Sequence, residues 1–419
     1  MKLKTSLRIV SALVLGLGAA GAQAAGFNLL EQTASGIGNS YAGSAANPEN
    51  ASTIYFNPAG MSELEGVQLS GGLTAIRPSF KFKNDGSTGP GGVVPLGTNN
   101  GGDAGSWGFV PNLYASWQLA PRWHVGLGIG APFGLRTEYD DDWVGRYQSR
   151  EFDIKTININ PSVSYKVNDQ LSIGAGVNYT KLDATYRRAA YMPGVGDLNA
   201  KLKADGDGWG WNAGLLYKVT PATRIGLSYR STVKINVDGN TKITHDMAGL
   251  IAKRDASTTV KLPDTAILSV AHDLNEKWQL LADVSWTGWS SIKSLDINNG
   301  GAPFDDELEL KFRDTWRVAL GANYKYNERW TLRGGLAWDQ SPIRSDKYRP
   351  TSLPDNDRYW ASIGARYSPN DKLSVDIGYA HLFVKSTKID NNTDATKGHV
   401  KGKYNSKADL IGVQVSYRF

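Results

Sequence analysis

The stretch Leu410-Ile-Gly-Val-Gln-Val-Ser-Tyr-Arg-Phe419 ends the chain and alternates between two kinds of side chain. Its apolar positions are Ile411, Val413, Val415, Tyr417 and Phe419. Successive side chains of a β-strand point to opposite faces, so this period of two predicts a strand with one apolar and one polar face. The same alternation recurs along the chain of 419 residues, for example over 153–167 and 308–326.

The composition favours an all-β chain and excludes several classes of protein. Glycine accounts for 47 residues, and there are 13 Trp and 19 Tyr, which suits many strands joined by turns. The absence of cysteine excludes disulfides and thiol catalysis. No apolar run reaches about 18 residues, which excludes a bundle of membrane-spanning helices. The 46 basic and 40 acidic residues are interspersed, so nothing indicates a nucleic-acid partner.

Residues 1–24 have the three regions of a secretory signal peptide. Residues 1–8 are basic, 9–20 form an apolar run too short to cross a bilayer as a helix, and Ala22-Gln23-Ala24 supplies the small-x-small cleavage pattern. We therefore expect an exported protein whose mature chain begins at Ala25. The alternative is a buried helix or a retained anchor.

Short polar turns recur at regular intervals, each between two alternating stretches, as in a series of β-hairpins. They lie at 120–122, 168–170, 220–223, 275–277, 327–329 and 370–372. Longer connections, rich in Gly, Asp, Asn and Ser, are expected at the opposite ends of the strands. They lie at 83–106, 135–152, 188–205, 238–257, 293–307, 344–353 and 387–405. Together these connections predict about fourteen strands over residues 66–419.

The positions of the aromatic residues distinguish a membrane barrel from a soluble sandwich, whose strands also alternate. Aromatic side chains border the short turns, where an interfacial girdle belongs: Trp123, Tyr165, Tyr217, Trp278, Tyr326, Trp330 and Tyr367. An even strand number, with short turns at one end and long loops at the other, is typical of outer-membrane barrels. We therefore predict a closed, antiparallel, 14-stranded transmembrane β-barrel. A barrel of this size has a lumen that must be filled or used.

Residues 25–65 precede the first strand and lack sustained alternation. The segment is rich in small residues, yet it also contains apolar side chains such as Phe27, Tyr41 and Phe56. It is therefore expected to fold inside the lumen as a plug. A periplasmic extension is the alternative.

Several blocks of sequence are similar to those of the FadL-type family of outer-membrane transporters. These are Ala25-Gly-Phe-Asn-Leu29, the triplet Asn57-Pro58-Ala59, Gly208-Trp-Gly-Trp-Asn-Ala-Gly-Leu-Leu-Tyr217, Tyr229-Arg-Ser-Thr-Val-Lys-Ile235 and Asp355-Asn-Asp-Arg-Tyr-Trp360. The final Phe419 resembles the terminal aromatic signature of such barrels. The resemblance implies a Gram-negative outer-membrane protein that transports long-chain fatty acids, or toluene and other hydrocarbons.

The resemblance also implies roles for particular residues. Asn57, Pro58 and Ala59 match the triplet of an N-terminal hatch, and Phe27 matches a segment near the ligand pocket. The third strand of the family is kinked, so that ligand leaves sideways through the barrel wall. The matching residues are Gly130, Ala131, Pro132, Phe133 and Gly134. A proline inside a strand removes a ladder donor, which supports a break here on physical grounds as well.

A carboxylate ligand would need a cation near its head group. Arg188 matches a family arginine that faces this group, with Arg187 adjacent; the alternative is that both arginines are simply solvated. A second family lysine has no equivalent, because its position falls near Leu308. This departure keeps a neutral hydrocarbon open as the ligand.

Other functions have less support in the sequence. The histidines show no metal-type spacing, and no catalytic constellation is evident, so neither an enzyme, a cofactor nor a metal site is expected. The acidic residues Glu138, Asp140, Asp141 and Asp142 could bind a divalent cation that bridges lipopolysaccharide, but a solvated loop surface is the favoured interpretation. Rival functions are a general aqueous porin and a structural or adhesive barrel. We expect a monomer in contact with lipopolysaccharide and membrane lipid.

Overall fold

The computed structural model describes residues 26–301 and 305–419, so the predicted signal peptide lies outside the described residues. The strands are β1 (Val67–Asn84), β2 (Gly108–Ala120), β3 (Trp123–Gly130), β4 (Gly134–Glu138), β5 (Glu151–Lys166), β6 (Leu171–Met192), β7 (Gly196–Thr220), β8 (Thr223–Arg230), β9 (Val233–His245), β10 (Gly249–Leu262), β11 (Thr265–Asp273), β12 (Trp278–Thr287), β13 (Ser294–Ile297), β14 (Asp306–Glu309), β15 (Thr315–Lys325), β16 (Trp330–Asp339), β17 (Arg358–Tyr367), β18 (Leu373–Val384), β19 (Thr387–Asn391) and β20 (Val400–Arg418). The helices are short: η1 (Ile37–Asn39), α2 (Thr53–Phe56), η2 (Pro58–Glu63), η3 (Pro90–Gly92), η4 (Trp289–Ser291), η5 (Asp346–Tyr348) and η6 (Ala395–Lys397). Among these residues, no helix is long and apolar enough to cross a membrane.

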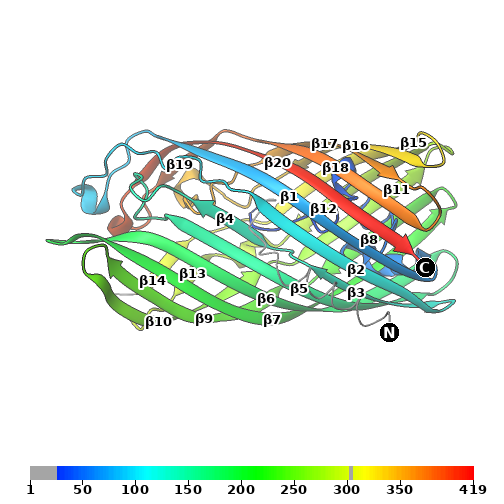
Figure 1. Cartoon of the computed structure of the whole chain (residues 1–419), viewed down its shortest axis with the longest axis horizontal. Helices are drawn as coiled ribbons and strands as arrows, with labels where there is room; N and C mark the ends of the chain where they lie inside the picture. The colour runs from blue at the N-terminus through cyan, green and yellow to red at the C-terminus, as the bar shows by residue number, and fades with distance from the viewer. Residues whose placement is uncertain (1–25, 302–304) are drawn as a thin grey trace, which may run out of the picture.

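All of these strands except β13 and β14 form one closed antiparallel barrel, tilted across its long axis (Figure 1), while β13 and β14 pair with each other in a separate two-stranded sheet. The ring is sealed where β1 pairs with β20, from Gln68 opposite Arg418 to Asn84 opposite Gly402. Four of the barrel strands are each divided into two segments, namely β3 and β4, β8 and β9, β10 and β11, and β18 and β19. Counted in this way over the described residues, the barrel has fourteen strands, so the predicted fold is confirmed.

The outer surface carries the apolar face of the alternating strands. On β20, Val413 is 47% exposed, whereas the neighbouring Gln414 points inward and is fully buried. Near the short turns, Trp123 packs on Tyr165 with ring centroids 4.6 Å apart, and Trp330 packs on Tyr367 at 4.7 Å. Toward the long loops, a second row of exposed aromatic residues includes Trp209. Two aromatic rows with an apolar surface between them mark the membrane-spanning band.

Two connections predicted as long loops are strands almost throughout, and a third, at 387–405, is strand over β19 and the start of β20. The ladder between β6 and β7 continues to Met192 opposite Gly196, and that between β9 and β10 continues to His245 opposite Gly249. The predicted connections at 188–205 and 238–257 are therefore wrong. The outward positions of these stretches are polar, as at Lys203 and Asp205, because they extend beyond the lipid, yet Leu202 and Ala204 point inward and the backbones still pair. The predicted strand over 308–326 is also shorter, since Lys311 has a left-handed φ of 45° and β15 begins at Thr315.

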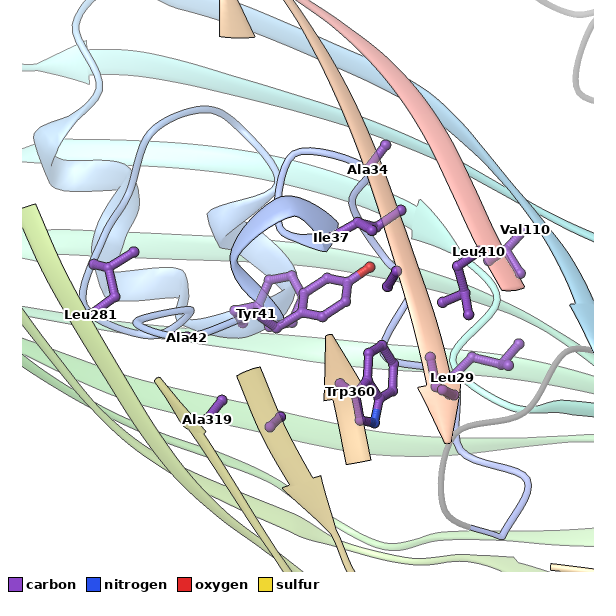
Figure 2. Close-up of a cluster of buried hydrophobic side chains, with 14 of the residues drawn as sticks. Leu29, Ala34, Ile37, Tyr41, Ala42, Val110, Leu281, Ala319, Trp360 and Leu410 are labelled. Carbon is purple, nitrogen blue, oxygen red and sulfur yellow. The ribbon is translucent and has the colours of Figure 1, made fainter. Parts of the chain in front are cut away.

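Residues 26–65 pack against inward-facing side chains from strands all round the barrel (Figure 2). The Tyr41 ring lies edge-on to Trp360 of β17, with centroids 6.4 Å apart, and its hydroxyl donates to the carbonyl oxygen of Thr33 at 3.0 Å. Ile37 and Leu29 lie in the same apolar cluster, which extends to Leu410 of β20.

A buried charge cluster also joins this segment to the barrel wall. Arg333 of β16 lies 2.7 Å from Glu49 of the segment and 3.0 Å from Asp376 of β18. Arg366 of β17 pairs with the same two carboxylates, at 3.1 and 2.9 Å. Two cations facing two anions leave no net charge inside, so removing any one of them would strand a buried charge.

Candidate ligand cavity and wall break

The ladder of the third strand is interrupted between Gly130, where β3 ends, and Gly134, where β4 begins. The N-terminal segment takes up part of the pairing that the wall lacks here. The backbone N–H of Leu29 donates to the carbonyl oxygen of Pro132 at 2.8 Å, and the N–H of Gly134 donates to the carbonyl oxygen of Phe27 at 2.9 Å. The residues suggested for a kink and for the N-terminal segment therefore lie together.

Four aromatic rings meet beside this break. The ring of Phe27 lies 4.8 Å from that of Trp289 and 5.9 Å from that of Phe133. Trp289, in η4, lies 5.9 Å from Phe312 on its other side. The preceding Gly26 has a φ of 67°, and a Cβ there would meet Trp289 at 2.7 Å, so only glycine fits. The start of the segment is thus clamped against the wall.

A cavity of about 520 Å³ extends from this aromatic cluster toward the long loops. Its apolar lining is formed by Phe27, Leu135, Phe152, Ile154, Val260, Ile292, Leu295, Leu308, Leu310, Phe312 and Leu353. The charged residues in the lining are Lys261, Lys293 and Asp296. A mostly apolar cavity of this size, with a few charged groups at its rim, suits a hydrophobic small molecule.

The triplet Asn57-Pro58-Ala59 anchors the N-terminal segment to the barrel at a second place, separate from the wall break. The side-chain amide of Asn57 donates to the carbonyl oxygens of Ala45 at 2.7 Å and of Leu215, on β7, at 2.9 Å. Its oxygen accepts from the N–H of Ala59 at 3.1 Å and so caps η2, with Pro58 as the first residue. A Cβ on Gly214 would come within 2.2 Å of the Asn57 oxygen, so this close approach requires glycine.

Arg188 and Arg187 do not line the cavity. The guanidinium of Arg188 is ion-paired with Asp306 at 3.1 Å, and Lys397 contacts the same carboxylate. Arg187 pairs with Asp141 and with Glu151, the latter at 3.4 Å. In this state both arginines are engaged by acidic side chains of the protein.

The acidic cluster at 138–142 is likewise engaged. Glu138 pairs with Arg136 at 2.7 Å, Asp141 with Arg187, and Asp142 accepts from the Asn99 amide at 2.6 Å. Within residues 26–301 and 305–419, no group of three or more His, Asp or Glu is placed to hold a metal ion.

Sequence reasoning did not find Trp289, Lys261 or Lys293. Trp289 lies at the end of a predicted strand, and its inward position arises because the strand stops at Thr287 and the chain turns through η4. The only available signal was Gly288, which precedes the turn. The lysines belong to alternating polar stretches that resemble any solvated strand end.

A closed barrel with an apolar outer band, an apolar internal cavity and a broken wall strand defines an outer-membrane transport barrel. Residues 15–419 match the family described as outer membrane protein transport protein (OMPP1/FadL/TodX). The chain belongs to this family. Its members are transport proteins of the outer membrane that carry hydrophobic compounds, and they are not enzymes.

Individual relatives match over almost the whole chain. Outer membrane protein P1 of Haemophilus influenzae is 33% identical over 453 residues, covering 96% of this chain and 97% of its own. The long-chain fatty acid transport protein of Escherichia coli K12 is 29% identical over 462 residues, covering 99% and 98%. The crystal structure of a Pseudomonas aeruginosa FadL homologue superposes with a TM-score of 0.85 at 26% identity, covering 94% of this chain and 100% of that one.

Proposed function

We propose that the protein carries long-chain fatty acids across the outer membrane. The observation that carries this proposal is the apolar cavity, which leads from the long-loop half of the barrel to Phe27 beside the wall break. Burial of a hydrocarbon chain yields about 0.8 kcal/mol per CH₂, so the lining alone can hold an extended tail without chemistry. The name of the Escherichia coli relative is consistent with this ligand.

In this proposal residues 26–65 act as a hatch. The segment contacts strands around the barrel and is fixed by Asn57 at one place and by the charge cluster of Glu49 at another. A lumen filled in this way would not conduct water and ions freely. Ligand would leave through the break at 130–134, once Phe27 and Leu29 release Pro132 and Gly134.

A neutral hydrocarbon is the second candidate, and one observation favours it. Arg188, the arginine suggested for a carboxylate head group, is already paired with Asp306. A fatty acid would have to compete with this aspartate, whereas a hydrocarbon would need no cation.

Two measurements test the proposal. Mass spectrometry of lipids extracted from the purified protein should identify fatty acids, and cells that express the protein should take up labelled oleate faster than cells without it. Recovery of aromatic or aliphatic hydrocarbons alone, with no oleate uptake, would favour the second candidate. Large, steady ion currents in a planar bilayer would instead indicate an aqueous porin.

A further inference from the structure

The barrel wall has a second interruption, between β10 and the chain that follows β12. The ladder of β11 and β12 ends at Thr265 opposite Thr287, and one more bond joins the Gly288 N–H to the Asp264 carbonyl oxygen at 2.9 Å. The next backbone contact is the reciprocal pair of Ser257 and Asn298, with both bonds at 2.9 Å. Within the described chain, no backbone hydrogen bond joins residues 258–263 to residues 289–297. We call this gap the β10 window.

Two features explain why no backbone hydrogen bonds close the window: Pro263, and the alternating direction of the backbone N–H and C=O groups along a strand. Pro263, at the break between β10 and β11, has no N–H to donate. Ser257 directs its backbone groups toward Asn298, so Thr259 and Lys261, two and four residues on, direct theirs to the same side. These groups therefore face the window and not β9.

The cavity passes through the wall at this window. Its lining includes the buried Val260 together with the exposed Thr259 and Lys261 on either side of it. Adjacent residues of a strand point to opposite faces, so a space that touches all three must pass round the edge of β10. A groove of about 380 Å³ on the outside shares Thr259, Ser294 and Asp296 with the cavity. The inner and outer spaces thus meet at the window.

The window opens just above the lipid. Tyr229 belongs to the second aromatic row, toward the long loops, and its hydroxyl donates to the Asp264 carboxylate at 2.8 Å. Asp264 lies at the lower edge of the window, the edge nearest the apolar band of the barrel. Above that edge, the outer faces of β9 and β10 are polar, with Asn236 and Thr259 among them. Water and lipid head groups at this level can satisfy the free backbone groups, which hydrocarbon could not do. The window therefore faces the polar layer of the outer leaflet.

Three lysines lie near the lower edge of the window, where the Asp264 carboxylate accepts from the Tyr229 hydroxyl. Lys261 lies directly opposite Lys234 in the β9–β10 ladder, and Lys293 lines the cavity across the gap. None of the three forms an ion pair with another described residue. Like charges on directly opposed residues destabilise a sheet, so an anionic group bound beside Lys261 and Lys234 would offset the repulsion between them. Asp296 lines the other end of the opening, so the positive charge is confined to one edge.

We propose that the β10 window is the intake port for an amphiphile with a carboxylate head and a long apolar tail. The molecule enters sideways from the outer leaflet, its head group stays between Lys261 and Lys293, and its tail extends to Phe312 and Phe27. This inference rests on the proposed function and adds the route and the head-group site. Intake would occur in the polar layer, while release at 130–134 would occur in hydrocarbon.

A reversible cross-link between the two edges of the window, here called a staple, tests the route. The chain has no cysteine, so the double variant Thr259→Cys/Ser294→Cys places the only two thiols on opposite edges, joined by oxidation or by a short bis-maleimide. The stapled protein should take up oleate at least tenfold more slowly, and reduction of the disulfide form should restore the rate. Ser257→Cys/Asn298→Cys, cross-linked at a pair whose backbones are already hydrogen-bonded, should transport normally.

Equal uptake by stapled and unstapled Thr259→Cys/Ser294→Cys, with the cross-link verified by mass spectrometry, would overturn the route while leaving fatty acid transport intact. Failure of the unstapled protein and of the parent to take up oleate would instead overturn the proposed function.

A charge variant tests the head-group site. Lys261→Gln/Lys293→Gln should weaken oleate binding at least fivefold and leave binding of methyl oleate unchanged, because the ester carries no charge. Lys253→Gln, on the outer face of β10 away from the cavity, is the matched control. Equal loss for both ligands, or loss of bound lipopolysaccharide with oleate binding unchanged, would overturn the assignment.

Discussion

The backbone N–H of Leu29 donates a 2.8 Å hydrogen bond to the carbonyl oxygen of Pro132, 103 residues further along the chain. This bond joins the start of the N-terminal segment to the one place where the third strand lacks its own ladder. Moving the segment therefore frees polar groups of the wall break at the same time. Displacement of the segment and opening of the break are expected to be one event.

Gln32 should control how readily this event occurs. Its side-chain amide donates to Ala131 at 2.8 Å and to Leu29 at 3.1 Å, and so ties the segment to the break. Gln32→Leu should cost about 1–2 kcal/mol of local stability. Hydrogen exchange at the amides of Leu29 and Gly134, which donate the two bonds between segment and break, should become roughly tenfold faster, as about 1.4 kcal/mol implies. Unchanged exchange would show that the amide does not hold the segment.

Asn57 should hold the far part of the segment. Asn57→Ala removes three hydrogen bonds, to Ala45, Leu215 and Ala59, and should cost about 3 kcal/mol. Limited proteolysis should cut within residues 26–65 of the variant while the barrel keeps its folded mobility on gels. Asn168→Ala, in an exposed short turn, is the control and should resemble the parent. A resistant segment in Asn57→Ala would contradict the anchoring role.

Arg188 and Asp306 together test whether a carboxylate can reach the arginine. Asp306→Asn removes the competing charge and should tighten oleate binding, while Arg188→Ala should weaken oleate binding much more than toluene binding. Titration of tryptophan fluorescence with each ligand would measure both effects. Equal losses for oleate and toluene in Arg188→Ala would exclude head-group pairing as its role.

Glu31 should make the fit of the segment depend on pH. Its carboxylate is fully buried and, apart from the backbone N–H of Glu31 itself, neither oxygen has a hydrogen-bond partner among the described residues. Burial raises the pKa of Glu31 to about 7, against a lowering by its backbone hydrogen bond and by Arg358 and Arg317. The folded state thus holds a proton that the unfolded chain loses above its ordinary pKa of 4.5. The free energy of unfolding is therefore greatest below pH 4.5, and it falls by about 3 kcal/mol as the pH rises to about 7.

Glu31→Gln should abolish this pH dependence, since the amide does not titrate. Urea unfolding of the parent and the variant at pH 4.5 and pH 8 would measure it, with the exposed Glu65→Gln as control. A parent protein that is equally stable at both values would contradict the buried, protonated carboxyl.

The sequence predicted the barrel because lipid imposes a strict pattern on the spanning part of each strand. Val413 must face out and Gln414 must face in, so the alternation is legible from the sequence alone. The pattern fades above the lipid, where the outer face of β7 meets water, as at Lys203 and Asp205, although Leu202 and Ala204 still point inward. The β6–β7 ladder persists there through backbone pairing, which no pattern of side chains reveals.

The site was predictable only where a residue constrains its own backbone. Pro132 indicated a break because proline cannot donate to a ladder. By contrast, the pairing of Arg188 with Asp306 joins residues 118 apart and depends on how the loops fold over the barrel. The same holds for the packing of Phe27 on Trp289, which requires both the turn after β12 and the left-handed Gly26.

The seam between β1 and β20 has a consequence for biogenesis. Asn84 at the end of β1 and Val400 at the start of β20 lie 316 positions apart in the sequence, so this edge of β1 must wait unpaired until β20 has been synthesised. A chain truncated before Val400 would keep two unpaired strand edges and could not form a closed barrel. Closure of the barrel therefore has to follow synthesis of β20, and until then both edges must be shielded from neighbouring chains.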